Sequence, residues 1–336
     1  MLRLLFCTIF FCSQVLYGQQ HVPLNFADSI ASWMTDNKVP VVAVGIIEKG
    51  KTKLTKVYGA AENTLFNVAS LTKPITTMTT LRLISKGEWK LDQPVFPFWI
   101  DPDIAGDSRN KKLTTRILLS HQSGFPNWRS SDSGQKLRFN FDPGTKYSYS
   151  GEGFEYLRHS LENNFHRNIQ QLAKSNVFDV IGMKNTSYGW NEHLLISRFA
   201  VPNDTNGRPI PGEPKITVNA ADWLITTIGD YTKFAQYVIN GGGISKDLFQ
   251  QMIEPQVIIR KRVYTEAMGL GWSVIKPLSS GEYLLMHTGH DEGQYSVIMV
   301  LPKSGRGLVI LTNGENGKNV IFSIIKATIP VPGLIP

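Results

Sequence analysis

Segments with strand character stand at both ends of the chain, and this placement limits how the chain can fold. An apolar run at 41–47 predicts a buried strand, and a turn at 48–51 separates it from a second strand at 52–58. Four more strands are predicted near the C-terminus, at 269–275, 283–287, 295–301 and 307–312. Because no clear linker divides the chain, we expect both groups to pair in one antiparallel sheet of the α/β (α+β) class.

Helices are predicted beside these strands and between them. Amphipathic stretches at 26–34 and 319–328 are expected to flank the sheet. The helical middle of the chain is broken by Gly- and Pro-bearing loops near 87–110, 122–146 and 202–215. We therefore expect a mainly helical domain, 69–259, inserted into a sheet domain made of 19–68 and 260–336. Together they are expected to act as one unit over about 25–330.

Residues 1–18 have the layout of a secretory signal peptide. One cation, Arg3, precedes an apolar run at 4–12, and the small residue Gly18 follows. We expect cleavage and export across the inner membrane to the periplasm or the exterior; an uncleaved N-terminal anchor is the alternative. Both cysteines lie in this segment, so the mature chain would have no disulfide and no thiolate chemistry. No second apolar stretch has the length of a membrane span.

The charge pattern argues against a nucleic-acid partner. Removal of Arg3 with the signal peptide lowers the net charge from +8 to +7. The remaining cations are scattered apart from short runs at 111–112 and 260–262, which are typical of a solvated face. We expect a small-molecule substrate, and the sequence leaves the oligomeric state open.

A Ser-x-x-Lys motif at Ser70–Lys73 is the first candidate for chemistry. The motif alone is weak, because it also starts at Ser108, Ser133, Ser273 and Ser323. Context favours the first copy: apolar residues follow it at helical spacing as far as Ile84, and Lys86-Gly87 is a good helix end. Pro74 is tolerated only if this helix begins near Ser70.

That placement has a chemical consequence. At a helix N-terminus the backbone N–H of Ser70 is free, and the helix dipole favours negative charge. Lys73 lies one turn later on the same face. A partly buried lysine can be neutral and accept the serine proton, which activates the hydroxyl as a nucleophile. The alternative is a helix cap with a surface lysine.

Two further segments favour the catalytic interpretation. Residues 142–151 are Asp-Pro-Gly-Thr-Lys-Tyr-Ser-Tyr-Ser-Gly, and residues 285–293 are Leu-Met-His-Thr-Gly-His-Asp-Glu-Gly. With Ser70 and Lys73 they resemble the superfamily of class C β-lactamases, D,D-peptidases and esterases, whose signatures are Ser-x-x-Lys, Tyr-x-Asn and Lys/His-Thr-Gly. Leu-Leu-Ser-His-Gln-Ser-Gly at 118–124 and Met-Gly-Leu-Gly-Trp at 268–272 extend the resemblance.

The resemblance implies a β-lactamase/transpeptidase-like fold and a role for each motif. Ser70 would attack the acyl carbon, Lys73 would accept its proton, and Tyr149 would pass that proton to the leaving group. The third motif, His287-Thr288-Gly289-His290, would bind substrate, and the amides of Ser70 and His290 would form the oxyanion hole. No metal and no organic cofactor are expected.

The chain departs from the family pattern at two positions. Tyr149-Ser150-Gly151 lacks the asparagine of Tyr-x-Asn. Tyr147 is an alternative for the relay, because Tyr147-Ser148-Tyr149 has the same three-residue spacing; Tyr149 is preferred because its distance from Pro143-Gly144 fits the family pattern better. His287 replaces a permanently charged lysine with a side chain that is mostly neutral at pH 7. We expect small esters to be preferred over β-lactams, and β-lactam turnover to rise at lower pH as His287 gains charge, until protonation of Lys73 stops catalysis.

Other polar and aromatic residues are expected to be structural. His287 and His290 with Asp291 have no third ligand at metal-site spacing. The remaining expectations are a hydrogen-bonded His121 under the site, a solvated face for Glu152 and Glu155, turn or helix caps at Asp142 and Asp230, and core or pocket wall for Trp223 and Trp272.

The leading interpretation is a serine hydrolase that forms an acyl-enzyme on Ser70 and cleaves an ester, an amide or a β-lactam, with esters slightly preferred. One alternative is a class C-type β-lactamase or D,D-peptidase acting on cell-wall peptides. Another class stays open as well: a non-catalytic domain that captures a β-lactam or a wall peptide.

Overall fold

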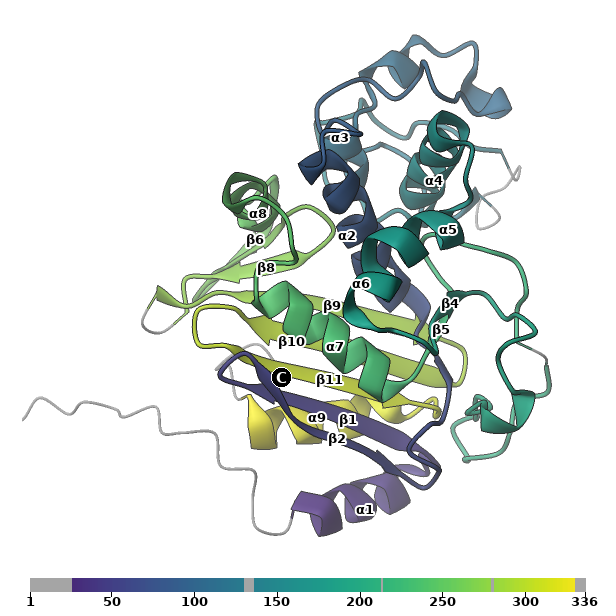
Figure 1. The fold of residues 1–336 in the computed structure, drawn as a ribbon, viewed down its shortest axis with the longest axis vertical. Coiled ribbons are helices and arrows are strands. Elements are labelled where there is room, and N and C mark those ends of the chain that lie inside the picture. The colour runs from purple at the N-terminus through teal and green to yellow at the C-terminus, as the bar shows by residue number, and fades with distance from the viewer. Residues whose placement is uncertain (1–25, 130–135, 213, 279–280, 330–336) are drawn as a thin grey trace, which may run out of the picture.

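An eight-stranded antiparallel sheet brings the two ends of the chain together, in the order β2-β1-β11-β10-β9-β8-β7-β6 (Figure 1). The computed structural model describes residues 26–129, 136–212, 214–278 and 281–329, so the expected signal peptide lies outside the described residues. The predicted fold class is confirmed. The strands are β1 (Val42–Glu48), β2 (Lys51–Tyr58), β6 (Val257–Lys261), β7 (Thr265–Met268), β8 (Ser273–Lys276), β9 (Leu284–Asp291), β10 (Gln294–Leu301) and β11 (Arg306–Thr312).

The apolar run at 41–47 becomes a strand inside the sheet because both its faces can be buried. β1 pairs with β2 on one side and with β11 on the other, where Val42 stands opposite Thr312 and Ile47 opposite Gly307. All its residues except Glu48 are buried. A short continuous apolar run suits such a strand.

The C-terminal half of the sheet differs in part from the prediction. Residues 269–272 form a turn, so β8 begins only at Ser273, and Gly271 has a left-handed φ of +70° that a regular strand does not contain. β6 and β7 were not predicted as strands. β6 ends the sheet, and the cations at 260–262 that suggested a solvated face belong to this exposed edge.

Helices cover both faces of the sheet (Figure 1). α1 (Phe26–Asn37) and α9 (Gly317–Thr328) pack together on one face, and α7 (Ile228–Ile239) crosses the other against β1 and β11. The approach of α7 requires Gly45, because a Cβ at that position would stand 1.9 Å from Thr232 Oγ1. The two flanking helices predicted near the ends of the chain are thus confirmed.

The remaining elements lie to one side of the sheet and around its edge (Figure 1). α2 is buried over almost its whole length, and a small second sheet has the order β3-β5-β4. No helix in the described part of the chain is long and apolar enough to cross a membrane. The boundary between sheet and helical domains stays a prediction. These elements are β3 (Phe66–Asn67), η1 (Ala69–Leu71), α2 (Thr72–Ser85), η2 (Pro102–Ile104), η3 (Ser108–Lys112), α3 (Thr115–Leu119), α4 (Gly151–Phe165), α5 (Ile169–Ala173), η5 (Lys174–Phe178), α6 (Asp179–Ile181), β4 (Ser187–Tyr188), η6 (Ile196–Arg198), β5 (Leu224–Thr226) and α8 (Lys246–Ile253).

Candidate active site

The chain turns sharply before α2, and Ser70 lies in that turn. Ser70 is the middle residue of η1, and α2 follows at Thr72, so the helix begins where the sequence predicted. Ala69 has a φ of +47°, a left-handed conformation that is uncommon outside glycine. The Thr72 hydroxyl donates to the Ala69 carbonyl at 2.6 Å. The nucleophile candidate therefore stands on a strained and braced turn.

Lys73 is completely buried beside Ser70, and both of the oxygens to which it donates are uncharged. Its Nζ donates to Ser70 Oγ at 3.0 Å and to the Ala221 carbonyl at 2.8 Å. Burial lowers the pKa of Lys73 to about 8, while the negative charges of Asp222, Asp291 and Glu155 oppose this decrease. Roughly a tenth of the Lys73 side chains are then neutral at pH 7, and this form can accept the Ser70 proton.

Tyr149 completes the group. Its ring centroid lies 4.7 Å from Lys73 Nζ. Burial raises the pKa of Tyr149 well above 10, and the nearby Ser70 side chain only partly offsets that increase. The phenol is therefore protonated at neutral pH. Tyr147 packs edge-on against His121, with ring centroids 6.2 Å apart, and its pKa is raised by burial to about 12. The structure thus brings Tyr149 to the Ser70–Lys73 pair.

His121 packs against Tyr149 and is hydrogen-bonded, as expected from the sequence. Its ring lies 4.4 Å from the Tyr149 ring, and its Nδ1 accepts a hydrogen bond from the Ser150 amide at 3.0 Å. Nδ1 must then be unprotonated, which makes Nε2 the protonated nitrogen. Burial lowers the pKa of His121 well below 6.5, so the ring is neutral. This arrangement orients Tyr149.

The third motif lies on β9, next to the nucleophile turn. The pairing of β8 with β9 reaches only as far as Met286, while β10 pairs with β9 to its end. Gly289 allows close contact, because a Cβ there would stand 2.3 Å from the Val68 carbonyl oxygen and 3.2 Å from the Ser70 amide nitrogen. β9 therefore passes within contact distance of the Ser70 amide. The oxyanion role of the Ser70 and His290 amides stays a prediction.

His287 is a buried, neutral side chain, and this bears on the expected pH dependence. The ring is buried, and its Nδ1 lies 2.9 Å from the Thr288 carbonyl, so Nδ1 is the protonated nitrogen. Burial and the nearby charge of Lys73 lower the pKa of His287 to about 3. His287 therefore does not gain charge as the pH falls from 8 to 6. The expected rise of β-lactam turnover in that range therefore loses its physical basis.

Three polar residues of this region escaped the sequence reasoning. Asn67 Nδ2 donates to Asp291 at 3.0 Å, and the nearby carboxyl groups of Asp291 and Asp222 shift each other's pKa. Asp291 was considered only as a metal ligand, although its place directly after the third motif was a usable signal. Asp222 had no motif around it.

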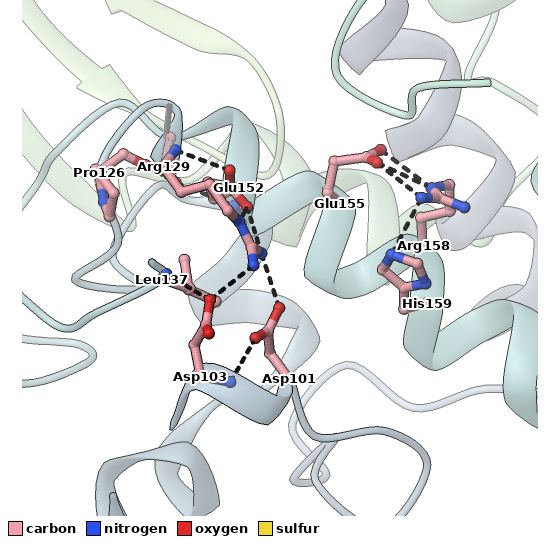
Figure 2. Close-up of polar contacts among 11 residues, drawn as sticks. Asp101, Asp103, Pro126, Arg129, Leu137, Glu152, Glu155, Arg158 and His159 are labelled. Atoms are coloured by element: carbon pink, nitrogen blue, oxygen red, sulfur yellow. Dashed lines mark hydrogen bonds and ion pairs between the residues drawn. The ribbon is translucent and has the colours of Figure 1, made fainter. Parts of the chain in front are cut away.

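Glu152 does not lie on a solvated face, contrary to expectation. It is only 6% exposed, and its carboxylate accepts the Arg129 amide at 2.9 Å and the Arg129 guanidinium at 2.9 and 3.1 Å. The same guanidinium pairs with Asp101 at 2.7 Å and Asp103 at 3.1 Å (Figure 2). These partners come from separate segments, so helical spacing alone could not show them.

Glu155 was also wrongly expected in solvent. It pairs with Arg158 at 2.8 Å (Figure 2), and its carboxylate accepts the Ala220 amide at 2.6 Å. Ala221, the next residue, supplies the carbonyl that binds Lys73. Glu155 thus anchors the segment that holds the candidate base.

The missing asparagine has a structural counterpart in Trp128. A Cβ on Gly151 would stand 2.5 Å from Trp128 Cη2, which no real side chain permits. Asn127 fixes this loop, since its backbone carbonyl accepts the amides of Gly151 and Glu152, each at 3.0 Å. The indole ring therefore fills the space into which a side chain at position 151 would project.

The other expected structural residues are found as follows. Trp272 is fully buried in the core, whereas Trp223 is partly exposed and has a left-handed φ of +63°. Asp230 fixes the turn before β4 by accepting the Asn185 amide at 2.7 Å. Asp142 instead pairs with Lys112 at 2.9 Å, so its carboxylate was wrongly expected to cap. Within the described ranges, no three His, Cys, Asp or Glu side chains group as a metal site requires.

Known proteins match both the sequence and the fold. A family model described as Beta-lactamase matches residues 26–322. Protein flp of Staphylococcus aureus strain MRSA252 is 22% identical over 302 residues, covering 82% of this chain and 60% of that protein. This chain therefore spans about 60% of the length of that relative.

Two solved structures show the same fold. The penicillin-binding protein homologue from Pyrococcus abyssi, described as octameric, superposes with a TM-score of 0.73 at 20% identity, over 89% of this chain and 76% of the other. A D-alanine carboxypeptidase from Burkholderia cenocepacia has a TM-score of 0.68 at 19% identity, over 88% of this chain and 99% of the other.

Proposed function

The chain belongs to the β-lactamase family, and we propose that it is a serine hydrolase that forms an acyl-enzyme on Ser70. The observation that supports this most directly is the 3.0 Å contact between Ser70 Oγ and the buried Nζ of Lys73. A lysine with a pKa of about 8 has a neutral form at working pH and can act as a general base. The Tyr149 phenol beside Ser70 and Lys73 supplies the second proton-transfer group.

The proposed acylation proceeds in two steps. Neutral Lys73 takes the Ser70 proton while Ser70 Oγ bonds to the carbonyl carbon, and the carbonyl oxygen gains the electron pair. The amides of Ser70 and His290 stabilise that oxygen. The tetrahedral intermediate then collapses, and Tyr149 donates its proton to the leaving group and regains one from the Lys73 ammonium. Water repeats the sequence on the acyl-enzyme and releases the acid.

Esters are the preferred substrates in this proposal. Position 151 offers no amide, Trp128 fills its space, and buried His287 offers no cation for a substrate carboxylate. Each polar interaction that a β-lactam or peptide would lack here costs about 1–3 kcal/mol in the transition state, or about one to two orders of magnitude in rate. An ester with a good leaving group depends less on such interactions. Export to the periplasm or the exterior, expected from residues 1–18, is part of the proposal.

The main alternative is a β-lactamase or D,D-peptidase acting on cell-wall peptides. The likeness to a D-alanine carboxypeptidase supports it. A third possibility is a domain that captures such molecules without turnover. The ratio of kcat/KM values for p-nitrophenyl butyrate and a chromogenic cephalosporin separates the first two. We expect the ester to be the better substrate at both pH 6 and pH 8; a higher cephalosporin value at both refutes the ester preference.

Labelling with a fluorophosphonate, followed by intact mass, tests the nucleophile. We expect one adduct on the wild type, none on Ser70→Ala, and a full adduct on Ser108→Ala, which removes the exposed serine of another Ser-x-x-Lys copy. Stable acylation by substrate without turnover favours the binding domain. An adduct that persists in Ser70→Ala rules out Ser70 as nucleophile.

A further inference from the structure

A series of polar contacts surrounds the nucleophile turn and connects it to β9. Asn67 contributes both ends of its side-chain amide: Oδ1 accepts the Ala69 amide at 2.9 Å, and Nδ2 donates to Asp291 Oδ2 at 3.0 Å. Because a backbone N–H can only donate, the Asn67 oxygen must face Ala69, and this fixes the orientation of the amide. Asn67 thus bridges the residue before Ser70 and the last residue of β9.

The turn needs such a support because Ala69 is strained. A non-glycine residue at φ +47° costs of the order of 1 kcal/mol and persists only where surrounding contacts require it. Asn67 holds the Ala69 N–H and Thr72 holds its carbonyl. The Ser296 hydroxyl on β10 donates to the Val68 carbonyl at 2.8 Å. The direction of the Ser70 amide therefore depends on these contacts.

Asp222 lies near Asp291, and the two carboxyl groups shift each other's pKa. Burial and the charge of Asp291 raise the pKa of Asp222 to about 7. Asp222 directly follows Ala221, whose carbonyl binds Lys73. Lys73, the 221–222 segment, Asp291 and Asn67 thus surround Ser70.

We propose that Asn67 and Asp291 are positioning residues, which hold the nucleophile turn against β9 and fix the separation of the two expected oxyanion donors. This proposal rests on the proposed function. His290, the second donor, directly precedes Asp291, so a bond from Asn67 to Asp291 sets the distance between the two backbone segments. Neither Asn67 nor Asp291 touches the reacting atoms in this scheme.

The carboxyl pair also sets the charge that Lys73 experiences. Above about pH 7 the pair is doubly negative and favours the Lys73 ammonium. Removing one carboxylate lowers the pKa of Lys73 and moves the acid limb of kcat/KM to lower pH. The ionisable groups that face Lys73 are Asp222 and Glu155, Asp291 and His287 on β9, His121, and Tyr149.

The two effects are separable by mutation. Asn67→Ala breaks the bridge without changing charge, so we expect kcat to fall about 10–100-fold, with KM within about threefold and the pH limb in place. Asp222→Asn keeps a donor to Asp291 but removes a charge. We expect a smaller loss of kcat than in Asn67→Ala, and an acid limb moved down by roughly half a unit to one unit.

Two further variants distinguish a loss of positioning from a loss of folding. Asn67→Asp retains the acceptor for Ala69 but repels Asp291. The ratio of its kcat to that of the wild type at the same pH should therefore rise at low pH, where the new carboxyl is protonated. Asp230→Asn is the control: this buried aspartate holds Asn185 and Lys233, so its loss should lower the melting temperature without changing kcat or the pH limb.

The outcomes distinguish the inference from the function on which it rests. If the wild type gives a Ser70 adduct and Asn67→Ala and Asn67→Asp keep kcat within about twofold, the positioning role is wrong and the proposed function stands. A pH limb that does not move in Asp222→Asn refutes the role of the pair. If the wild type gives neither adduct nor turnover, the proposed function itself fails.

Discussion

Lys73 and Arg129 are two cations near the start of α4 that differ in how their charge is compensated. Arg129 pairs with Asp101, Asp103 and Glu152 (Figure 2). Burial works against its charge, but these pairs outweigh burial and raise its pKa further above the usual arginine value. Lys73 is more deeply buried, donates only to neutral oxygens, and has its pKa lowered to about 8.

The difference separates structure from chemistry. A guanidinium with three carboxylate partners is fixed in one protonation state, so it is useful for holding segments together. An amine that burial has brought close to neutrality can exchange a proton. Glu152 and Tyr149 are three residues apart, yet one belongs to the fixed network and the other to the reactive group.

Replacing each cation by methionine gives the largest expected difference, because one variant should lose rate and the other should lose stability. Lys73→Met should slow acylation by about 10³–10⁴-fold, because the general base is lost. Its melting temperature should hold or rise, since a desolvated charge is removed. Arg129→Met should lower the free energy of unfolding by about 2–3 kcal/mol, because Asp101 and Glu152 remain buried without a cation. Its rate per folded molecule should stay within about threefold.

Fluorophosphonate labelling rates and thermal unfolding of both variants measure this contrast. If Arg129→Met lost activity as severely as Lys73→Met while still folded, the division between a structural and a reactive cation would be wrong.

The two phenols provide a second contrast of intermediate size. Tyr149→Phe removes the proposed proton relay beside Ser70, so kcat should fall about 10²–10⁴-fold. Tyr147→Phe removes a hydroxyl further from the pair, and we expect less than about a fivefold loss. Steady-state kinetics with one ester decide the matter; the reverse order of effects would assign the relay to Tyr147.

Acid stability gives the smallest expected effect. The pKa of His287 is about 3 in the folded state and near 6.5 when unfolded, so below pH 6.5 the unfolded state binds an extra proton. Stability from this group is therefore lost as the pH falls, by about 1 kcal/mol between pH 6.5 and 5.5.

Urea unfolding of His287→Gln should show a correspondingly shallower pH dependence. His193→Gln, at an exposed position, should follow the wild type. Equal slopes for wild type and His287→Gln would mean that His287 titrates normally in the folded protein.

The features that were predicted correctly from the sequence depend on residues close together in the chain. Helical spacing and Pro74 placed the start of α2, and short motifs placed Ser70, Lys73 and Tyr149 in one group. The strand expected at 269–275 was too long, because a glycine with left-handed φ interrupts it. The partners of Lys73 and Asn67 come from 221–222 and from the end of β9, segments more than a hundred residues away in the chain. Only the folded arrangement shows that Glu152 is paired with Arg129, whereas Asp222 has a pKa raised to about 7.

The pairing of β1 with β11 has a consequence for the order in which the molecule assembles. Val42 meets Thr312 only after almost the whole chain between them exists. Closing a loop of that length costs roughly 5 kcal/mol of chain entropy before any contact forms. Contacts so distant in sequence are typical of slow folding. During synthesis β1 and β2 can form only a hairpin, with one edge of β1 unpaired until the last strands emerge. We therefore expect chains truncated before β11 to expose that edge and to aggregate, even when every residue of the candidate active site up to His290 is present.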